Sequence, residues 1–76
     1  MKIKDEKIRK AVRAWADANG YDKLWVKLWT YCGHGAISFY NEDAGDNEIT
    51  FNTVEKFGLE HLKYYTITEL CGEEEE

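Results

Sequence analysis

The sequence predicts a small two-layer α+β domain, in which an N-terminal helix packs on an antiparallel sheet of three to four strands in the order α-β-β-β-(α)-β. Three observations predict it: apolar residues recur with helical spacing near the start, later segments alternate apolar and polar residues, and glycine-containing turns separate these segments. The 76 residues suffice for one domain. We expect residues 1–72 to form that single domain and the glutamates of 73–76 to form an acidic tail.

The first helix is predicted over residues 4–19. Ile8, Val12 and Trp15 recur at i, i+4 and i+7, and Asn19-Gly20 supplies a stop because glycine adopts positive φ without strain. The outward side is predicted to carry ion pairs between residues four apart. These pairs are Asp5–Arg9, Glu6–Lys10 and Arg13–Asp17.

A β-hairpin is predicted to follow, with strands over residues 24–32 and 36–41 and a turn at Gly33-His34-Gly35. If Gly33 and His34 form a two-residue loop, Leu28 lies opposite Phe39 and Thr30 lies opposite Ile37. Alternation places one set of apolar side chains under the helix. This set comprises Leu24, Val26, Leu28, Ile37 and Phe39.

The remaining chain predicts a short third strand over 48–51, a short helix over roughly 53–61 and a last strand over 63–71. Asn52 and Glu55 have the spacing of a capping box at the start of that helix. The helix would bury Val54 and Phe57, with His61 as a further candidate. The segment 63–71, KYYTITELC, is rich in β-forming residues and alternates as a strand does.

None of the sequence patterns typical of catalysis or of a bound cofactor is present. The chain lacks a Gly-x-Ser-x-Gly elbow, a phosphate-binding glycine loop, a His-Glu-x-x-His motif and a dinucleotide fingerprint. The loop that contains Asp43 and Asp46 is too short, and its acids are wrongly spaced, for a twelve-residue calcium site. We therefore expect no enzymatic activity and no cofactor.

Cysteine and histidine usage raises the question of zinc. Four residues have the inventory of a Cys₂His₂ site, namely Cys32, His34, His61 and Cys71. They lack the paired Cys-x-x-Cys or His-x₃-His spacing of such sites, so we predict no metal. The charged start MKIKDEKIRK has no apolar run, and no stretch approaches the length of a membrane span, which predicts a cytoplasmic protein with Cys32 and Cys71 as thiols.

The sheet face opposite the helix is the best candidate for a functional surface. The 11 aromatic residues exceed what a core of this size needs. A partner-binding site is predicted at Trp25, Lys27, Trp29, Tyr31, Tyr40, Glu42, Asp43, Asp46 and Glu48. The alternative is that Lys27 and Tyr40 stack on each other and that the last strand or the second helix covers the tryptophans.

Charge indicates the kind of partner. Residues 1–13 carry a balance of +4, whereas the rest of the chain carries −9. We expect a non-catalytic, acidic protein-binding module whose partner is another protein with a basic surface. In size, acidity and aromatic content the chain resembles small phage-encoded accessory or inhibitor proteins, such as anti-CRISPR proteins and DNA mimics, and the resemblance covers composition alone.

Two alternatives stay open. The protein could be a homodimer or larger homo-oligomer sealed through its aromatic face, with a structural or regulatory role. It could also bind nucleic acid directly through the basic stripe of the first helix, although the acidic remainder of the chain would repel phosphates. That stripe comprises Lys7, Arg9, Lys10 and Arg13.

Overall fold

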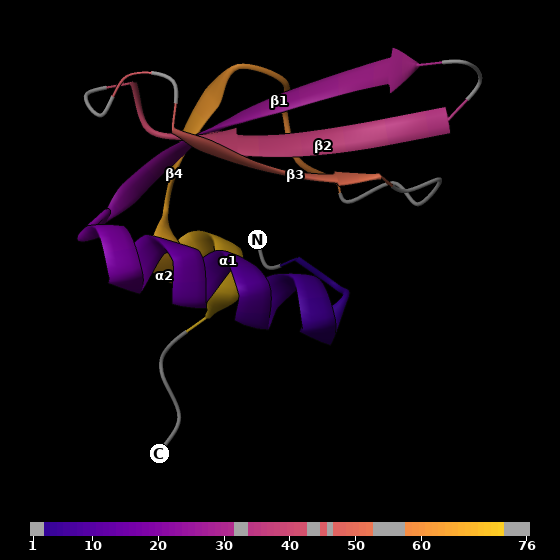
Figure 1. Cartoon of the computed structure of the whole chain (residues 1–76). Helices are drawn as coiled ribbons and strands as arrows, with labels where there is room; N and C mark the ends of the chain where they lie inside the picture. The colour runs from indigo at the N-terminus through magenta and orange to yellow at the C-terminus, as the bar shows by residue number, and fades with distance from the viewer. Residues whose placement is uncertain (1–2, 32–33, 43–44, 46, 53–57, 73–76) are drawn as a thin grey trace.

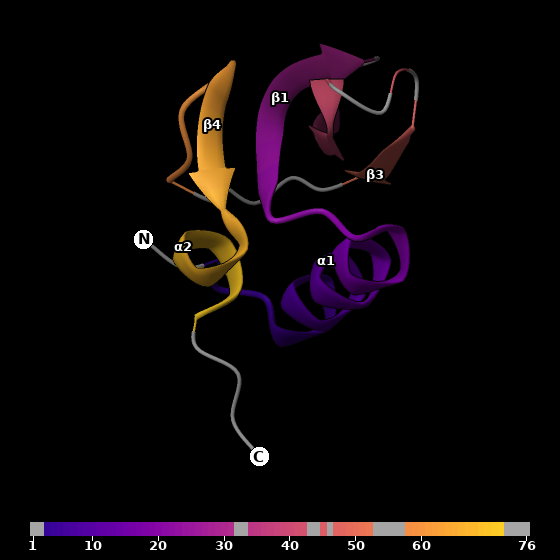
Figure 2. The same ribbon diagram turned by 90° about the vertical axis from the view of Figure 1, so that its left-hand side faces the viewer.

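A four-stranded antiparallel sheet in the order β3-β2-β1-β4 forms one layer, and two helices form the other (Figures 1 and 2). The structure is a computed structural model that describes residues 3–31, 34–42, 45, 47–52 and 58–72. Its elements are α1 (Glu6–Asn19), β1 (Lys23–Tyr31), β2 (His34–Tyr40), β3 (Glu48–Asn52), β4 (Lys63–Thr66) and α2 (Ile67–Cys71). The predicted α+β class, with the N-terminal helix on an antiparallel sheet, is confirmed. The predicted acidic tail, 73–76, lies outside the described residues.

Helix α1 begins two residues later than predicted because Asp5 serves as its N-cap. The Asp5 side chain accepts a hydrogen bond from the Ile8 N–H at 3.1 Å, which satisfies a donor that has no partner within the helix. Gly20 ends the helix at φ 73°, a left-handed conformation that glycine adopts without strain. In the described part of the chain, no helix combines the length and the apolarity needed to cross a membrane.

The hairpin forms as predicted, but its register differs by two residues. Leu28 pairs with Ile37 rather than with Phe39, and Thr30 pairs with Gly35 rather than with Ile37. Tyr31 and His34 form the last pair, so the connection is Cys32-Gly33 and not Gly33-His34. Because side chains alternate with a period of two, a shift of two residues leaves every side chain on its predicted face.

The second predicted helix is not present in the part that the structure describes. Val54, Glu55 and Phe57 lie outside the described residues, and from Gly58 onward the chain is irregular, with a turn at His61 and Leu62. His61 is exposed rather than buried. Its Nδ1 accepts a hydrogen bond from the Leu28 N–H at 2.9 Å and so occupies the edge of β1 beyond β4.

The predicted last strand over 63–71 is wrong in its second half, because the chain turns into α2 after Thr66. Thr66 and Glu69 form a reciprocal capping box: Thr66 Oγ1 accepts from the Glu69 N–H at 3.1 Å, and Glu69 Oε1 accepts from the Thr66 N–H at 3.0 Å. Ile67 and Leu70 are then three residues apart on one helix side and both reach the core. The Thr-x-x-Glu signature therefore overrides the apparent alternation.

The core lies between the sheet and the two helices. Phe39 at its centre is 0% exposed, and its ring packs edge-to-face against Phe51 with 6.3 Å between the centroids. As predicted, Trp15, Leu28 and Ile49 pack against this cluster, although all three stay partly accessible. The buried members are Ile3, Val12, Ala16, Leu24, Val26, Ile37, Phe39, Leu59, Tyr65, Ile67 and Leu70.

Two arginines of α1 fasten the ends of the described chain to the helix layer. Arg9 donates to the carbonyl oxygens of Ile3 at 2.7 Å and Lys4 at 3.0 Å, and Arg13 donates to the carbonyl oxygen of Gly72. The predicted pairs Asp5–Arg9 and Arg13–Asp17 are therefore wrong. The Glu6–Lys10 pair is present at 3.5 Å, and both of its side chains are well exposed.

The first prediction concerns Phe39. Truncating this fully buried ring in Phe39→Ala should lower the free energy of unfolding by about 3–5 kcal/mol, because the lost transfer energy adds to the cost of the cavity. Urea unfolding followed by circular dichroism measures the change. Lys7→Ala, at an exposed position of α1, is the control and should stay within about 0.5 kcal/mol of wild type. A Phe39→Ala protein that unfolds at the wild-type midpoint would contradict this account of the core.

The second prediction concerns the cap of α2. The two hydrogen bonds from Thr66 hold the pKa of Glu69 below its ordinary value, with the backbone bond as the larger cause. A carboxyl group whose pKa is lowered by folding adds stability above its unfolded-state pKa, and that stability is lost as the pH falls through the folded-state pKa.

Thr66→Ala removes the hydroxyl and keeps the backbone N–H, so it should raise the pKa of Glu69 only part of the way toward its ordinary value. Loss of the N-cap side chain should separately cost about 1 kcal/mol of stability at neutral pH. A carboxyl-carbon NMR titration measures the first effect and thermal unfolding the second. Thr68→Ala, at an exposed position of the same helix, is the control and should leave the Glu69 titration unchanged. An unchanged Glu69 titration in Thr66→Ala would refute the role of the cap.

Candidate functional site

The candidate site is the sheet face turned away from α1 and α2, which we call the outer face. Figure 2 shows both helices on the same side of the sheet. On the outer face, four residues from the four strands lie in register across the sheet. In spatial order these are Glu48 of β3, Tyr40 of β2, Trp25 of β1 and Tyr64 of β4. Three aromatic rings and a carboxylate therefore form one row.

Glu42 holds one end of this row in place. The Trp25 indole N–H donates to Glu42 Oε2 at 2.8 Å, and the Tyr64 hydroxyl donates to the same oxygen at 3.2 Å. The two rings stack with 4.0 Å between centroids and a tilt of 37°. Asn41 fixes the segment before Glu42, because its amide donates to the Lys23 carbonyl oxygen at 2.9 Å. Both bonds to Glu42 end on Oε2, so its other carboxylate oxygen carries neither of them.

Trp29 lies farther along β1 and covers the centre of the outer face. Its indole N–H donates to Ser38 Oγ at 3.1 Å, and Ser38 shares a 2.6 Å hydrogen bond with Thr50 Oγ1. Ser38 is 0% exposed although neither α1 nor α2 covers this face, whereas Trp29 remains 49% exposed. The indole is thus anchored by its polar atom and presents much of its apolar surface to solvent.

Lys27 lies between the two tryptophans along β1. Its ammonium is 4.6 Å from the centroid of the Tyr40 ring, within the range of a cation–π contact. A shallow depression of about 330 Å³ opens beside this pair. It is lined by Lys27, Tyr40, Glu42, Gly45 and Glu48.

The structure gathers most of the predicted site residues on or beside the outer face. Trp25, Lys27, Trp29, Tyr40 and Glu48 project from its strands, and Glu42 lies at its rim. Asp43, Asp46 and the side chain of Tyr31 lie outside the described residues. The alternative interpretation also has support: Lys27 stacks on Tyr40, and Tyr64 of β4 covers part of Trp25. The alternative fails for Trp29, which remains 49% exposed.

Three contributors to this face were missed by the sequence analysis: Tyr64, Ser38 and Thr50. The signal for Tyr64 was available, since pairing the predicted last strand with β1 puts one of its two adjacent tyrosines on each face. The positions of Ser38 and Thr50 on this face depend on the strand register. The register brings both residues beside Lys27, in one row across β1, β2 and β3. Their roles as supports for Trp29 required the structure.

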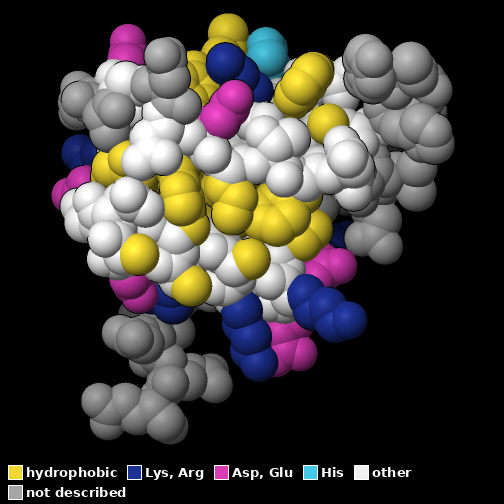
Figure 3. All heavy atoms as spheres, in the orientation of Figure 1, with side chains coloured by type: hydrophobic (Ala, Val, Ile, Leu, Met, Phe, Trp, Pro, Cys, Tyr) yellow, Lys and Arg dark blue, Asp and Glu magenta, His cyan; other side chains and the backbone are white. Residues whose placement is uncertain are grey.

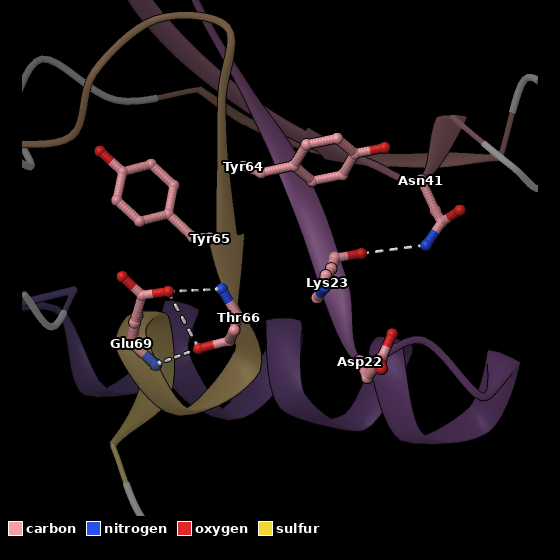
Figure 4. Close-up of a pocket in the computed structure, with 7 residues that line it drawn as sticks. All are labelled: Asp22, Lys23, Asn41, Tyr64, Tyr65, Thr66 and Glu69. Atoms are coloured by element: carbon pink, nitrogen blue, oxygen red, sulfur yellow. Dashed lines mark hydrogen bonds between the residues drawn. The ribbon is translucent and has the colours of Figure 1, made fainter.

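A second hollow, of about 480 Å³, lies at one end of the sheet next to α2 (Figure 4). Its lining residues are Asp22, Lys23, Asn41, Tyr64, Tyr65, Thr66 and Glu69. Figure 4 shows the Tyr64 ring directed toward the Asn41 side and the Tyr65 ring directed the other way. Asn41 and Glu69 are engaged in structural hydrogen bonds there, so this hollow ranks below the outer face as a site.

The side of the molecule seen in Figure 3 has a different character. A band of hydrophobic side chains crosses the middle, and Lys and Arg side chains gather below it, over α1. Trp15 of α1 and Ile49 and Phe51 of β3 are partly buried and pack against the core. Of the basic stripe predicted to contact nucleic acid, Arg9 and Arg13 have their guanidinium groups bonded to backbone carbonyls.

The positions of the cysteines and histidines do not bring metal ligands together in the described part of the chain. Among the described residues, no three His, Cys, Asp or Glu side chains are arranged to hold a metal ion. Cys32 and the side chain of His34 lie outside that part. Burial raises the pKa of the Cys71 thiol, which donates to the Arg9 carbonyl oxygen at 3.5 Å. A raised pKa keeps the thiol protonated and less reactive.

The third prediction tests the pair of hydrogen bonds that Glu42 accepts from Trp25 and Tyr64, which we call the Glu42 clamp. Glu42→Ala removes the acceptor of the Trp25 indole N–H, a bond worth about 1 kcal/mol, so this proton should exchange with solvent about five times faster. NMR exchange measurements on the indole signal detect the change. Glu48→Ala removes the same charge from the same face without touching the clamp and should leave the exchange rate unchanged. Equal acceleration in both variants would contradict a specific clamp.

Comparison with known proteins adds no assignment to this geometry. No protein-family model, no curated protein and no solved structure matches the chain. The residues of the outer face and their contacts are therefore the features of this protein that bear on its function.

Proposed function

We propose that this protein is a non-catalytic, acidic protein-binding module that binds a basic surface of another protein through its outer face. The observation that carries the proposal is that the tryptophans of this face have their polar atoms bonded while aromatic surface stays exposed to solvent. Their indole nitrogens are bonded within the face, while Trp29 is 49% and Tyr64 38% exposed. A partner gains apolar contact area without having to supply hydrogen-bond acceptors for the two indole N–H groups.

Preorganisation supports the same proposal. Association costs free energy for every side chain that must be ordered. Trp25 is held by Glu42 and stacked on Tyr64, and Trp29 is anchored on Ser38. Rigid Trp and Tyr side chains of this kind are enriched among the residues that dominate binding energies at protein interfaces.

Charge supports a basic partner. Beyond residue 13 the chain carries a balance of −9, and Glu42 and Glu48 flank the aromatic row. We further propose that the partner handles nucleic acid, because the groove such a protein uses for phosphates is cationic. The carboxylates would then take the place of phosphate charges, and binding would inhibit the partner in the manner of a DNA mimic.

The fourth prediction tests the outer face as a binding surface. Proteins captured by the wild-type chain from lysate of its source cells are identified, purified and titrated with wild type and variants. Trp29→Ala should weaken binding of the true partner about 30-fold, which corresponds to about 2 kcal/mol. The association rate should fall as salt rises, because it is steered by charge. Lys7→Ala, on the opposite layer, is the control and should bind like wild type.

Three results would contradict the proposal. One is equal binding by Trp29→Ala and wild type, with folding of the variant confirmed by circular dichroism. Another is sedimentation of wild type as a dimer that Trp29→Ala converts to monomers, which would favour the homo-oligomer. The third is tight, salt-dependent binding of a DNA duplex by the chain itself, which would favour the nucleic-acid binder.

A further inference from the structure

We infer that the depression beside Tyr40 receives the guanidinium group of an arginine from the partner protein, and that Lys27 occupies the same cation site in the free protein. This inference rests on the proposed function and names the chemistry at one point of the outer face. The depression is lined by Lys27, Tyr40, Glu42, Gly45 and Glu48, and at about 330 Å³ it is sized for a side chain rather than for a large ligand.

The position of Lys27 shows that the site accepts a cation. The ammonium is 4.6 Å from the Tyr40 centroid, over the negative face of the ring. Yet Lys27 forms none of the ion pairs found among the described residues, which are Glu6–Lys10 and Glu60–Lys63. It therefore uses the ring and leaves the carboxylates of Glu42 and Glu48 without a close cationic partner in the described part of the chain.

Arginine fits this arrangement better than lysine. Its planar guanidinium stacks on an aromatic ring while its N–H donors, which lie in the guanidinium plane parallel to that ring, reach carboxylates at the side. Glu42 has a carboxylate oxygen that carries neither the Trp25 nor the Tyr64 bond, and Glu48 is exposed and pairs directly with Tyr40 across β2 and β3. A partner lysine would only reproduce the contact that Lys27 already makes.

The arginine must come from a different protein. This chain has only two arginines, Arg9 and Arg13, and both guanidinium groups are bonded to backbone carbonyls in the helix layer. A second copy would have to break one of those contacts to supply the group. Charge complementarity therefore favours a basic foreign partner over self-association at this point.

The fifth prediction uses a blocked tetra-arginine peptide as the probe, titrated at low salt and followed by NMR signals of the Tyr40 ring and the Glu48 amide. Lys27→Met removes the internal occupant and should raise the affinity for the peptide at least about threefold. Lys10→Met makes the same change in net charge on an exposed position of α1 and should raise it by less. Tyr40→Leu should lower the affinity about tenfold, and Tyr40→Phe, which keeps a ring, should retain it. The matched tetra-lysine peptide should bind wild type more weakly than the arginine peptide.

Several outcomes would overturn the inference. Equal gains in Lys27→Met and Lys10→Met would mean that only net charge matters. Undiminished peptide binding by Tyr40→Leu would place the peptide elsewhere, and equal binding of the two peptides would remove the preference for arginine. If the natural partner depends on Trp29 but not on Lys27 or Tyr40, this inference fails while the proposed function stands. If the arginine peptide behaves as expected but no partner depends on Trp29, the proposed function fails alone.

Discussion

The structure depends on the pleat of β1, the strand that pairs with β2 on one edge and with β4 on the other. Pairing on both edges fixes the orientation of the strand, so each of its side chains lies on one of the two faces of the sheet. Leu24 and Val26 point into the core and are completely buried. Trp25 lies between them in the sequence and Trp29 is four residues farther along the strand, so both are forced to the opposite face. The presence of large aromatic residues on the outer face is a direct consequence of how the core is built.

The sequence was sufficient to predict features that depend on periodicity. The stripe of Ile8, Val12 and Trp15 predicted α1, and the alternation in β1 predicted which side chains face α1. The predicted hairpin register was wrong by two residues because Gly33 and Gly35 allow the turn at more than one position. The predicted and the observed registers place every side chain on the same face of the sheet, so the alternation of the strands could not distinguish them. Thr66 and Glu69 form a capping box that alternation concealed, so a strand was predicted where α2 begins.

The contacts that organise the candidate site could not be read from spacing. Glu42 was predicted as a charge for a partner, and it proves to be the acceptor that positions Trp25 and Tyr64. Arg9 and Arg13 were predicted to face solvent, and they instead bind backbone carbonyls. In each case the partner lies in another segment of the chain, so the pairing is set by tertiary geometry. Long polar side chains can choose among several such partners, which is why their roles escape sequence analysis.

The contact between the two ends of the described chain has a practical consequence. The Ile3 N–H donates to the Leu70 carbonyl oxygen at 2.9 Å, and Arg9 and Arg13 hold the backbone on both sides of this contact from α1. Residues close to both ends therefore meet in the helix layer, on the opposite side of the sheet from Trp29. A short linker could join Ile3 to Gly72, so the described part of the chain is suited to circular permutation, with new ends opened at an exposed turn. Immobilisation through an exposed residue of α1 would likewise leave the aromatic residues of the outer face accessible to a binding partner.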